Sequence, residues 1–488
     1  MVDNTVAQIY DVSYKEHNSL NTIATMGILT GSYLTDLLGL ITALTALVYA
    51  YFKWKYQYWK KKNVPYIEPT IPFGNFENPF RRTSYLMKLI GDIYKQAKSK
   101  ASPAYVVVDL ELVKHVLTKD FRYFESRGMY TNDKDDPIGS HLFSLSGTRW
   151  RNLRAKLSPT FSTGKLKAMF QTLTDCGFVL EKYIEENIDS TEAVDSKDVL
   201  GRFTADIIGS CAFGIECNSF NEPNSPFREF GSKVFTMTKL AAMKIMFCTS
   251  FPNLARALRV TQVSKDVSVF YTQVVKETVA YREKNNYARK DFLQLLIDMR
   301  NNRDDREKAD NGEGTALTMN EIVAQSFLFF IAGFETSSTT MTFVLFEMAT
   351  HPKLQDKVRE EINTILAKHN NQITYDSLNE MKYLRQVIDE TLRIYSPARV
   401  LHRQCVMDYK VPGENVIIEK GTKVFIPIEG IHYDEEYYKN PHEFDPERFN
   451  EENKKKRHPY THLPFGEGPR PGNITPPSPR LRLGRERA

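Results

Sequence analysis

Residues 441–470 read PHEFDPERFNEENKKKRHPYTHLPFGEGPR, and the motifs in this segment give the strongest indication of the fold. Its first part, at 441–449, has the pattern PxxFxPxRF, and its last part, at 465–470, reads FGEGPR. The glycines of the last part permit a tight turn and a close approach of the backbone to a ligand. Arg448 can complete a buried network with acidic and basic groups from elsewhere in the chain, because buried charges persist only when they are paired and hydrogen-bonded.

Three shorter motifs precede this stretch. Residues 390–393 read ETLR, and positions i and i+3 of a helix share a face, so that Glu390 and Arg393 can pair. Taken alone, such a pair usually marks a surface ion pair. Residues 332–336 read AGFET and interrupt a long apolar helix. A hydroxyl beside a carboxylate is unfavourable in such a helix, so the two groups indicate a function. Residues 150–154 read WRNLR, which places an indole N–H and a guanidinium on one helical face.

The order and spacing of these five motifs resemble the cytochrome P-450 family of haem-thiolate monooxygenases. The resemblance covers residues 64–470. Three further segments, at 58–75, 202–220 and 289–300, are similar to the insect microsomal group of that family, family 6 and its relatives. The resemblance implies oxidation of lipophilic compounds such as xenobiotics, fatty acids or hormones. It also implies haem b as the cofactor and an NADPH-cytochrome P-450 reductase as the electron-supplying partner.

The predicted fold is mainly α, with a large helical domain, a small β-sheet region and a single N-terminal membrane anchor. Apolar residues recur with a period near 3.6, which indicates helices, at 84–98, 163–188, 199–213, 227–245, 265–285, 319–349 and 353–368. A β-branched run predicts a strand at 105–108. The segments 410–411, 416–418 and 424–427, separated by turns at 412–413 and 420–421, predict a hairpin set.

Composition and charge narrow the class of protein. Of the 488 residues, 41% are hydrophobic and 26% charged, which excludes a disordered, collagenous or polytopic membrane chain. Aromatic residues make up 12%, enough to line an apolar cavity or to fill a core. The net charge is +5, and residues 53–62 alone carry five lysines and no acid, so a general nucleic-acid surface is not expected. The five cysteines are widely spaced without a CxxC pair, which argues against a disulfide scaffold and a zinc site.

The N-terminal part is predicted to be a membrane anchor. Residues 37–52 form an uncharged apolar run that spans roughly 24 Å as a helix, and extension back to Gly27 reaches the length of a bilayer core of about 30 Å. The lysines that follow place the rest of the chain in the cytosol, on the endoplasmic reticulum membrane by the resemblance. A buried helix of a soluble domain is the alternative. The prolines at 65–72 predict a stiff hinge.

The resemblance assigns roles to individual residues. Glu335 and Thr336 match the acid–alcohol pair that delivers protons for dioxygen activation. Residues matching haem contacts are Trp150, Arg154, Arg403, Phe465 and Arg470. Residues matching the structural network behind the haem are Glu390, Arg393 and Arg448. Residues near the family's substrate-contact stretches are Phe143, Phe330, Ile331, Ala332, Ala398 and Val400.

The chain departs from the family at the ligand of the iron. The family places a cysteine two residues after the arginine of FGxGxR, where this chain has Gly472, and no cysteine follows Cys405. In the family the thiolate of that cysteine drives O–O cleavage. Glycine has no side chain that could coordinate iron, so we expect no metal ligand at this position. The resemblance supports neither Cys405 nor His458 or His462 as a replacement. The Pro- and Arg-rich residues 471–488 replace the family's haem-packing helix and last strands, a pattern typical of a frameshift or a misread exon boundary.

The predicted organisation is therefore an N-terminal extension with the anchor and the basic segment at 1–62, an incomplete cytochrome P-450 domain at 63–470 and a divergent tail at 471–488. A segment at 98–103 is shorter than in the family. Three functions remain open. The chain is a membrane-bound monooxygenase whose recorded C-terminus is wrong, a haem-free relative that binds lipophilic ligands or a reductase, or a product that does not fold stably.

Overall fold

The computed structural model describes residues 33–57, 71, 105–187, 193–236, 238–301 and 316–471. The chain divides into two units. The first comprises residues 1–89 and 100–103, and its described part contains helix α2, Tyr33–Lys55. The second comprises residues 90–99 and 104–488 and contains every other described helix and strand. The predicted segments at 84–98 and 98–103 lie outside the described residues, as do nearly all of the proline-rich hinge and the tail from Gly472 onward.

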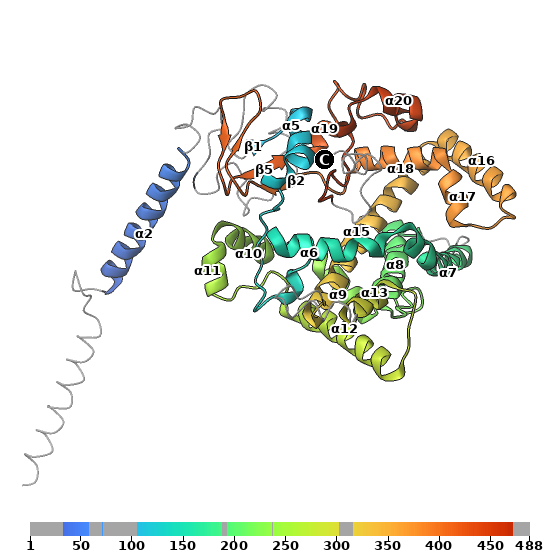
Figure 1. The fold of residues 1–488 in the computed structure, drawn as a ribbon, viewed down its shortest axis with the longest axis horizontal. Coiled ribbons are helices and arrows are strands. Elements are labelled where there is room, and N and C mark those ends of the chain that lie inside the picture. Colours follow the sequence, from blue (N-terminus) through green and yellow to red (C-terminus); the bar gives the residue numbers. More distant parts are fainter. Residues whose placement is uncertain are drawn as a thin grey trace, which may run out of the picture. The chain divides into compact units, whose positions relative to one another are not determined.

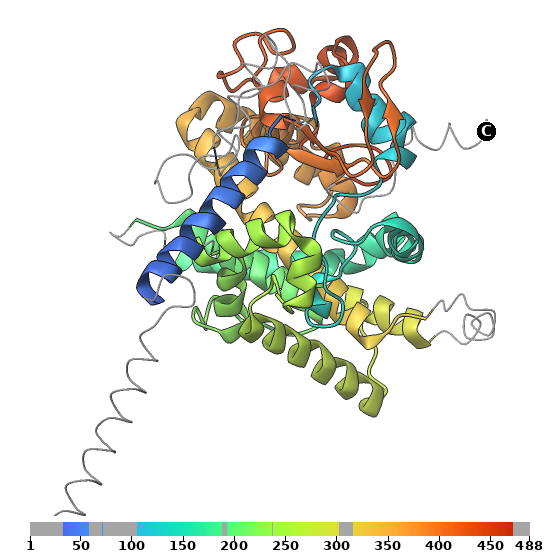
Figure 2. The same ribbon diagram turned by 90° about the vertical axis from the view of Figure 1, so that its left-hand side faces the viewer.

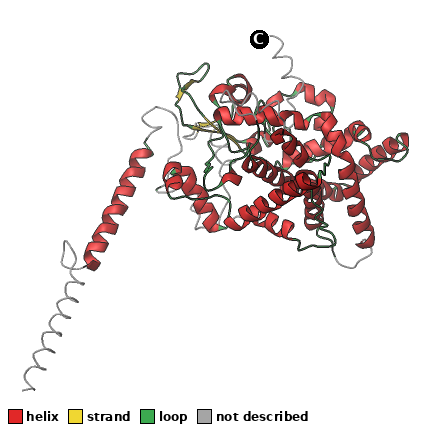
Figure 3. Cartoon of the chain, turned by 60° about the horizontal axis from the view of Figure 1, so that its bottom comes forward, coloured by secondary structure: helices red, strands yellow, loops and turns green. Residues whose placement is uncertain are grey.

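The second unit is mainly helical, as predicted, with few strands (Figure 3). Its longer helices are α6 Gly147–Leu157, α7 Thr163–Asn187, α8 Ser196–Ile208, α9 Pro226–Phe235, α10 Lys239–Ser250, α12 Lys265–Asn285, α13 Phe292–Asn301, α15 Met319–Thr350, α16 Pro352–Lys368 and α18 Lys382–Ile394. Its shorter α-helices are α5 Leu110–Lys114, α11 Pro252–Ala257, α17 Tyr375–Glu380, α19 Ile428–His432 and α20 Glu451–Lys456. The predicted helix at 227–245 is two helices, because Thr238 caps the N-terminus of α10.

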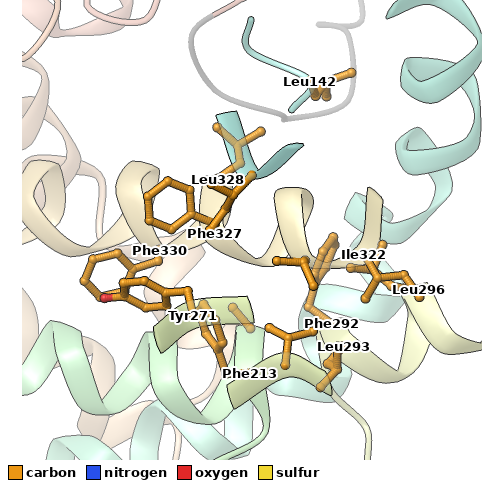
Figure 4. Packing of buried hydrophobic residues seen from close by; sticks show 14 of the residues in the cluster. Leu142, Phe213, Tyr271, Phe292, Leu293, Leu296, Ile322, Phe327, Leu328 and Phe330 are labelled. Atoms are coloured by element: carbon orange, nitrogen blue, oxygen red, sulfur yellow. The ribbon is translucent and has the colours of Figure 1, made fainter. Parts of the chain in front are cut away.

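Helix α15 organises the helical part of this unit. A capping box between Thr318 and Glu321 fixes its start, since each side chain satisfies a free backbone N–H of the other. Phe327, Phe330 and Ile322 of α15 are buried against α12 and α13, where Figure 4 shows their side chains beside Tyr271 and Phe292. Although α15 is long and apolar enough to cross a membrane, it is therefore a core helix of this unit.

The strands lie at the other end of the second unit from α12 and α13 (Figures 1 and 2). A three-stranded sheet has the order β1–β5–β2, with β1 Tyr105–Val106 parallel and β2 Leu401–Gln404 antiparallel to β5 Lys423–Ile426. Strands β3 Tyr409–Lys410 and β4 Ile417–Ile418 form a separate hairpin. The predicted strands are present, but β5 pairs with β1 and β2 instead of extending the hairpin.

Helix α2 is a candidate membrane anchor. It has 23 residues, contains the predicted apolar run and ends in Lys53 and Lys55. None of its residues is buried. Its length and hydropathy are sufficient to cross a membrane.

Candidate functional site

Three buried arginines converge between the sheet and α6. Arg403 lies on β2, Arg127 follows a β-bridge that joins Ser126 to the end of the same strand, and Arg470 ends the FGEGPR turn. Their exposed fractions are 1%, 7% and 2%. We call Arg127, Arg403 and Arg470 the arginine cluster.

The guanidinium groups of the arginine cluster donate to backbone carbonyls. Arg470 donates to the carbonyls of Glu125 at 2.7 Å and Phe143 at 3.0 Å, and also to that of Leu145. Arg403 donates to the carbonyl of Arg470 at 3.0 Å. Arg127 donates to those of Phe143 and Pro471, each at 3.0 Å. These bonds fix the orientation of the side chains, but carbonyl groups carry no net charge to balance three cations.

Within the part of the chain that the structure describes, the charges of the cluster are not balanced by carboxylates. Within the described residues, no member of the cluster forms an ion pair with Asp or Glu. The nearby carboxylate of Glu125 accepts two hydrogen bonds from Arg151, at 2.8 and 3.1 Å. The Nε atoms of Arg403 and Arg470 are buried without a hydrogen-bond partner in the described part of the chain. Such donors are rare in folded proteins and indicate a missing partner.

Burial and mutual repulsion disfavour the charged form of these groups. Burial lowers the pKa of Arg403 to about 10, and burial together with the charge of Arg403 lowers the pKa of Arg470 to about 9. Burial followed by the charges of the other arginines lowers the pKa of Arg127 well below its ordinary value. The pKa of neighbouring His402 falls to about 4 through burial and then these cations. An anion bound here would reverse these shifts.

Helix α6 supplies the next two predicted contacts. The side chain of Trp150 is buried, and its ring lies 4.6 Å from the guanidinium carbon of Arg470. Arg154 is four residues further along the helix and half-buried, and burial lowers its pKa. Phe143, predicted to fall near a substrate-contact stretch, lies against Arg127, with its ring centre 3.9 Å from the guanidinium carbon.

The FGEGPR turn positions Arg470. Gly466 and Gly468 have φ angles of 75° and 86°, in the left-handed region that favours glycine. A Cβ atom on Gly468 would lie 2.0 Å from the backbone oxygen of Leu117, so a side chain has no room there. Phe465 at the start of the turn is half-buried.

A second set of charges, the Glu390–Arg393–Arg448 network, is paired within the chain. Glu390 and Arg393 are fully buried, and Arg393 donates two hydrogen bonds to Glu390 at 2.7 and 2.8 Å. The Nε atom of Arg448 lies 3.3 Å from Oε1 of Glu390, without hydrogen-bond geometry. The backbone N–H of Asp445 donates to the same oxygen at 3.0 Å. The chain therefore supplies both signs of charge at this place.

The predicted acid–alcohol pair lies in the middle of α15. The hydroxyl of Thr336 donates to the carbonyl of Ala332, one turn earlier. Glu335 forms an ion pair with Lys197 of α8, with Nζ and Oε1 3.0 Å apart, and accepts a hydrogen bond from Thr339 at 3.2 Å. Each side chain of the pair with Lys197 is 39% exposed. The two residues thus make separate contacts and do not hydrogen-bond to each other.

The remaining predicted substrate residues differ in exposure. Phe330 is fully buried and packs against Phe213, Phe227 and Tyr271. Ala332 is exposed. The side chains that are half-buried are those of Ile331, Ala398 and Val400.

Cys405, His458 and His462, the alternatives considered as iron ligands, make contacts within the protein. All five cysteines are free. Cys405 is buried in the sheet region, its thiol donates to the carbonyl of Met407 at 2.8 Å, and burial raises its pKa to about 11. His462 contacts the carbonyl of Asp389, and His458 contacts Glu111. Within the described residues no group of three metal-ligating side chains occurs.

The donor set fits one end of haem b and not the other. The arginine cluster, with its unpartnered donors, suits two carboxylates, because planar guanidinium groups bind carboxylates in bidentate fashion. An axial thiolate is not provided by the described cysteines, and Gly472 at the family's ligand position lies outside the described residues.

Sequence reasoning missed two residues of this region. Arg127 was detectable as an arginine inside the aromatic-flanked segment FESRGMY, where it precedes Gly128. Lys197 lies far from Glu335 in sequence, and only the packing of α8 on α15 brings the two together.

Comparisons with known proteins agree with the motifs. A family model described as Cytochrome P450 matches residues 60–471. The chain is 43% identical to Cytochrome P450 6A1 of Musca domestica, over 90% of this chain and 87% of that protein. It is 40% identical to Cytochrome P450 6a2 of Drosophila melanogaster, over 89% and 88%. It is 39% identical to Cytochrome P450 6k1 of Blattella germanica, over 90% and 87%.

Proposed function

The chain belongs to the cytochrome P-450 family of haem monooxygenases, and on this premise we propose that its arginine cluster binds the two propionates of haem b. The observation that carries the proposal is the set of three buried cations that have no carboxylate partner within the described residues. Trp150 would pack beside Arg470, and Arg154 would add a fourth guanidinium from α6. The family implies a redox partner and small-molecule substrates.

The finer function follows from the same premise. We propose lipophilic substrates, namely xenobiotics, fatty acids or hormones, and electrons from NADPH through NADPH-cytochrome P-450 reductase. We also propose that α2 anchors the chain in the endoplasmic reticulum membrane with the second unit on the cytosolic face; its length, its apolar composition and the lysines at its end support this. Removal of residues 1–62 should move the protein to the soluble fraction, and unchanged tight association with membranes would contradict the anchor.

Haem held by a thiolate supplies dioxygen activation in this family. The part of this chain would be to hold and move protons. Thr336 donates its hydroxyl proton to the carbonyl of Ala332, so the lone pairs of its oxygen are available to accept a hydrogen bond. Glu335 would exchange protons with solvent once its contact with half-exposed Lys197 opens.

A second candidate, a catalytically inactive relative, is favoured by a specific observation. Gly472 has no side chain that could coordinate iron, and burial raises the pKa of each of the five cysteines, which keeps them as thiols. We propose that the sequence as it stands does not turn over. Of the functions considered, this one fits the residues of the literal chain best.

The reduced carbon-monoxide difference spectrum tests both candidates. We expect the unmodified chain to lack the red-shifted Soret band of thiolate-ligated haem. A chain carrying Gly472→Cys and the family's usual C-terminal segment should show that band and NADPH-dependent oxidation. The red-shifted band in the unmodified chain would overturn the inactive candidate. Haem loading by neither chain, with folding verified by circular dichroism, would overturn the haem proposal.

A further inference from the structure

The charge balance of the arginine cluster leads to a prediction about its ligand that does not involve iron. Arg127, Arg403 and Arg470 lie together with half-buried Arg154, and the carboxylate of Glu125, which acts on Arg470 electrostatically, pairs with Arg151. A ligand with two carboxylates on one edge would supply the missing negative charge. It would also supply acceptors for the unpartnered Nε atoms of Arg403 and Arg470.

The metal end of such a ligand finds no comparable partner in the described part of the chain. Cys405 donates its thiol proton to backbone carbonyls of Met407 and Ile418. His432, which is fully buried, contacts the carbonyl of Arg393 through Nδ1 and accepts from the N–H of Leu463 through Nε2. Position 472 is glycine. A coordinate bond to iron therefore contributes little to the free energy of binding.

We infer that this chain recognises the dicarboxylate edge of a tetrapyrrole and that it binds the metal-free porphyrin as tightly as haem. The inference rests on the proposed function, because it places the tetrapyrrole at the same arginine cluster. It goes further by making the propionates, and not the iron, the source of affinity. It assigns metal-free porphyrins as ligands, which a site built around an axial thiolate would hold less tightly than haem.

Three probes on the unmodified chain test this inference in detergent micelles. They are haem b, metal-free protoporphyrin IX and protoporphyrin IX dimethyl ester, which keeps the ring and lacks both charges. We expect the first two to bind with dissociation constants within about threefold of each other, a difference below the tenfold that 1.4 kcal/mol represents. The dimethyl ester should bind at least about tenfold more weakly, because hydrogen bonds to charged groups are the strong ones.

A matched pair of variants locates the site. Arg403→Gln removes a cluster charge, whereas Arg399→Gln removes a half-exposed charge just before the same strand, 3.7 Å from Glu429. We expect Arg403→Gln to weaken binding of protoporphyrin IX at least about tenfold, and Arg399→Gln to leave it unchanged. If Arg403→Gln fails to fold, the comparison of protoporphyrin IX with its dimethyl ester on the unmodified chain still tests whether the carboxylates are recognised.

The outcomes separate this inference from the proposed function. Haem binding that is more than tenfold tighter than porphyrin binding would overturn the inference and leave the haem site in place. Equal binding of the dimethyl ester would show that the arginine cluster is not the recognition element. Binding of neither haem nor porphyrin by a folded chain would overturn the proposed haem function as well.

Discussion

Two groups of buried charge differ in how they are balanced. In the Glu390–Arg393–Arg448 network, the carboxylate and its partners come from the same chain, and each charge has a counter-charge within 3.3 Å. In the arginine cluster, three cations donate to backbone carbonyls, and within the described residues none of them forms an ion pair with Asp or Glu. A balanced group holds the fold together, whereas an unbalanced one indicates a ligand of opposite charge.

The largest expected effect is on the balanced group. Glu390→Gln keeps the shape of the side chain and leaves Arg393 buried without a negative charge, which should lower the free energy of unfolding by about 3–5 kcal/mol. Chemical denaturation measures this change. The control is Glu452→Gln, an exposed partner of Lys456, which should cost less than about 1 kcal/mol. A loss of the same size in both variants would contradict the role given to the network.

A smaller effect on stability is expected in the FGEGPR turn, which positions Arg470 in the arginine cluster. Gly468→Ala places a Cβ against the backbone of Leu117 at a φ of 86° and should lower the free energy of unfolding by about 1–3 kcal/mol more than Gly413→Ala. Gly413 is the control because its φ is also positive, at 78°, and nothing lies within 4 Å of its Cβ position. Thermal unfolding compares the two variants. Equal losses would show that the close approach at Leu117 is not restrictive.

Substitution in the arginine cluster should change stability much less than substitution in the Glu390–Arg393–Arg448 network. In the unliganded chain, Arg403→Gln relieves repulsion while it loses hydrogen bonds, so the free energy of unfolding should change by less than about 1 kcal/mol. Denaturation of the unliganded protein tests this. A loss as large as that of Glu390→Gln would mean that the chain itself balances the charge of Arg403.

The pH dependence of stability also distinguishes the arginine cluster from the balanced network. The pKa of Arg403 is about 10 in the folded chain, below its ordinary value of 12.5, so above about pH 10 the unfolded state binds more protons. Stability contributed by this group should therefore rise with pH in that window. The difference in unfolding free energy between the unmodified chain and Arg403→Gln should show this slope. Bound porphyrin should abolish the slope, because its carboxylates raise the pKa again.

The smallest effect on stability is expected for the partly exposed ion pair between Lys197 and Glu335. Lys197 and Glu335 are each 39% exposed, so solvent screens their attraction. Lys197→Met should lower the free energy of unfolding by about 0.2–1 kcal/mol, as for other exposed pairs. Lys167→Met is the control, because its pair with Asp376 is also exposed. A loss above about 2 kcal/mol would show that the pair stabilises the fold as a buried ion pair does.

Local patterns predicted the helices well. The 3.6-residue period located α7, α12, α15 and α16 to within a residue at most ends, since each has one continuous apolar stripe. The break between α9 and α10 was missed because Thr238 caps a helix inside an apolar stretch. Strand pairing was partly missed, because β5 pairs with β1 across more than three hundred residues.

The candidate site was predictable where a motif carries it. The FGEGPR turn and the ETLR pair name Arg470, Glu390 and Arg393 directly. The convergence of Arg127 with Arg403 is a property of the fold, because the bridge from Ser126 to Gln404 aligns two segments that sequence spacing cannot relate. The burial of Phe330 was not predictable from the sequence. Apolar residues surround much of α15, so the pattern does not indicate which face of the helix packs into the core.

Unbalanced charge, and not a metal ligand, is proposed to define the binding site of this chain. The most direct test is the titration of the unmodified protein with metal-free protoporphyrin IX and with its dimethyl ester. We expect protoporphyrin IX to bind as tightly as haem and at least about tenfold more tightly than the ester. Equal binding of the acid and the ester, or binding of haem alone, would contradict it.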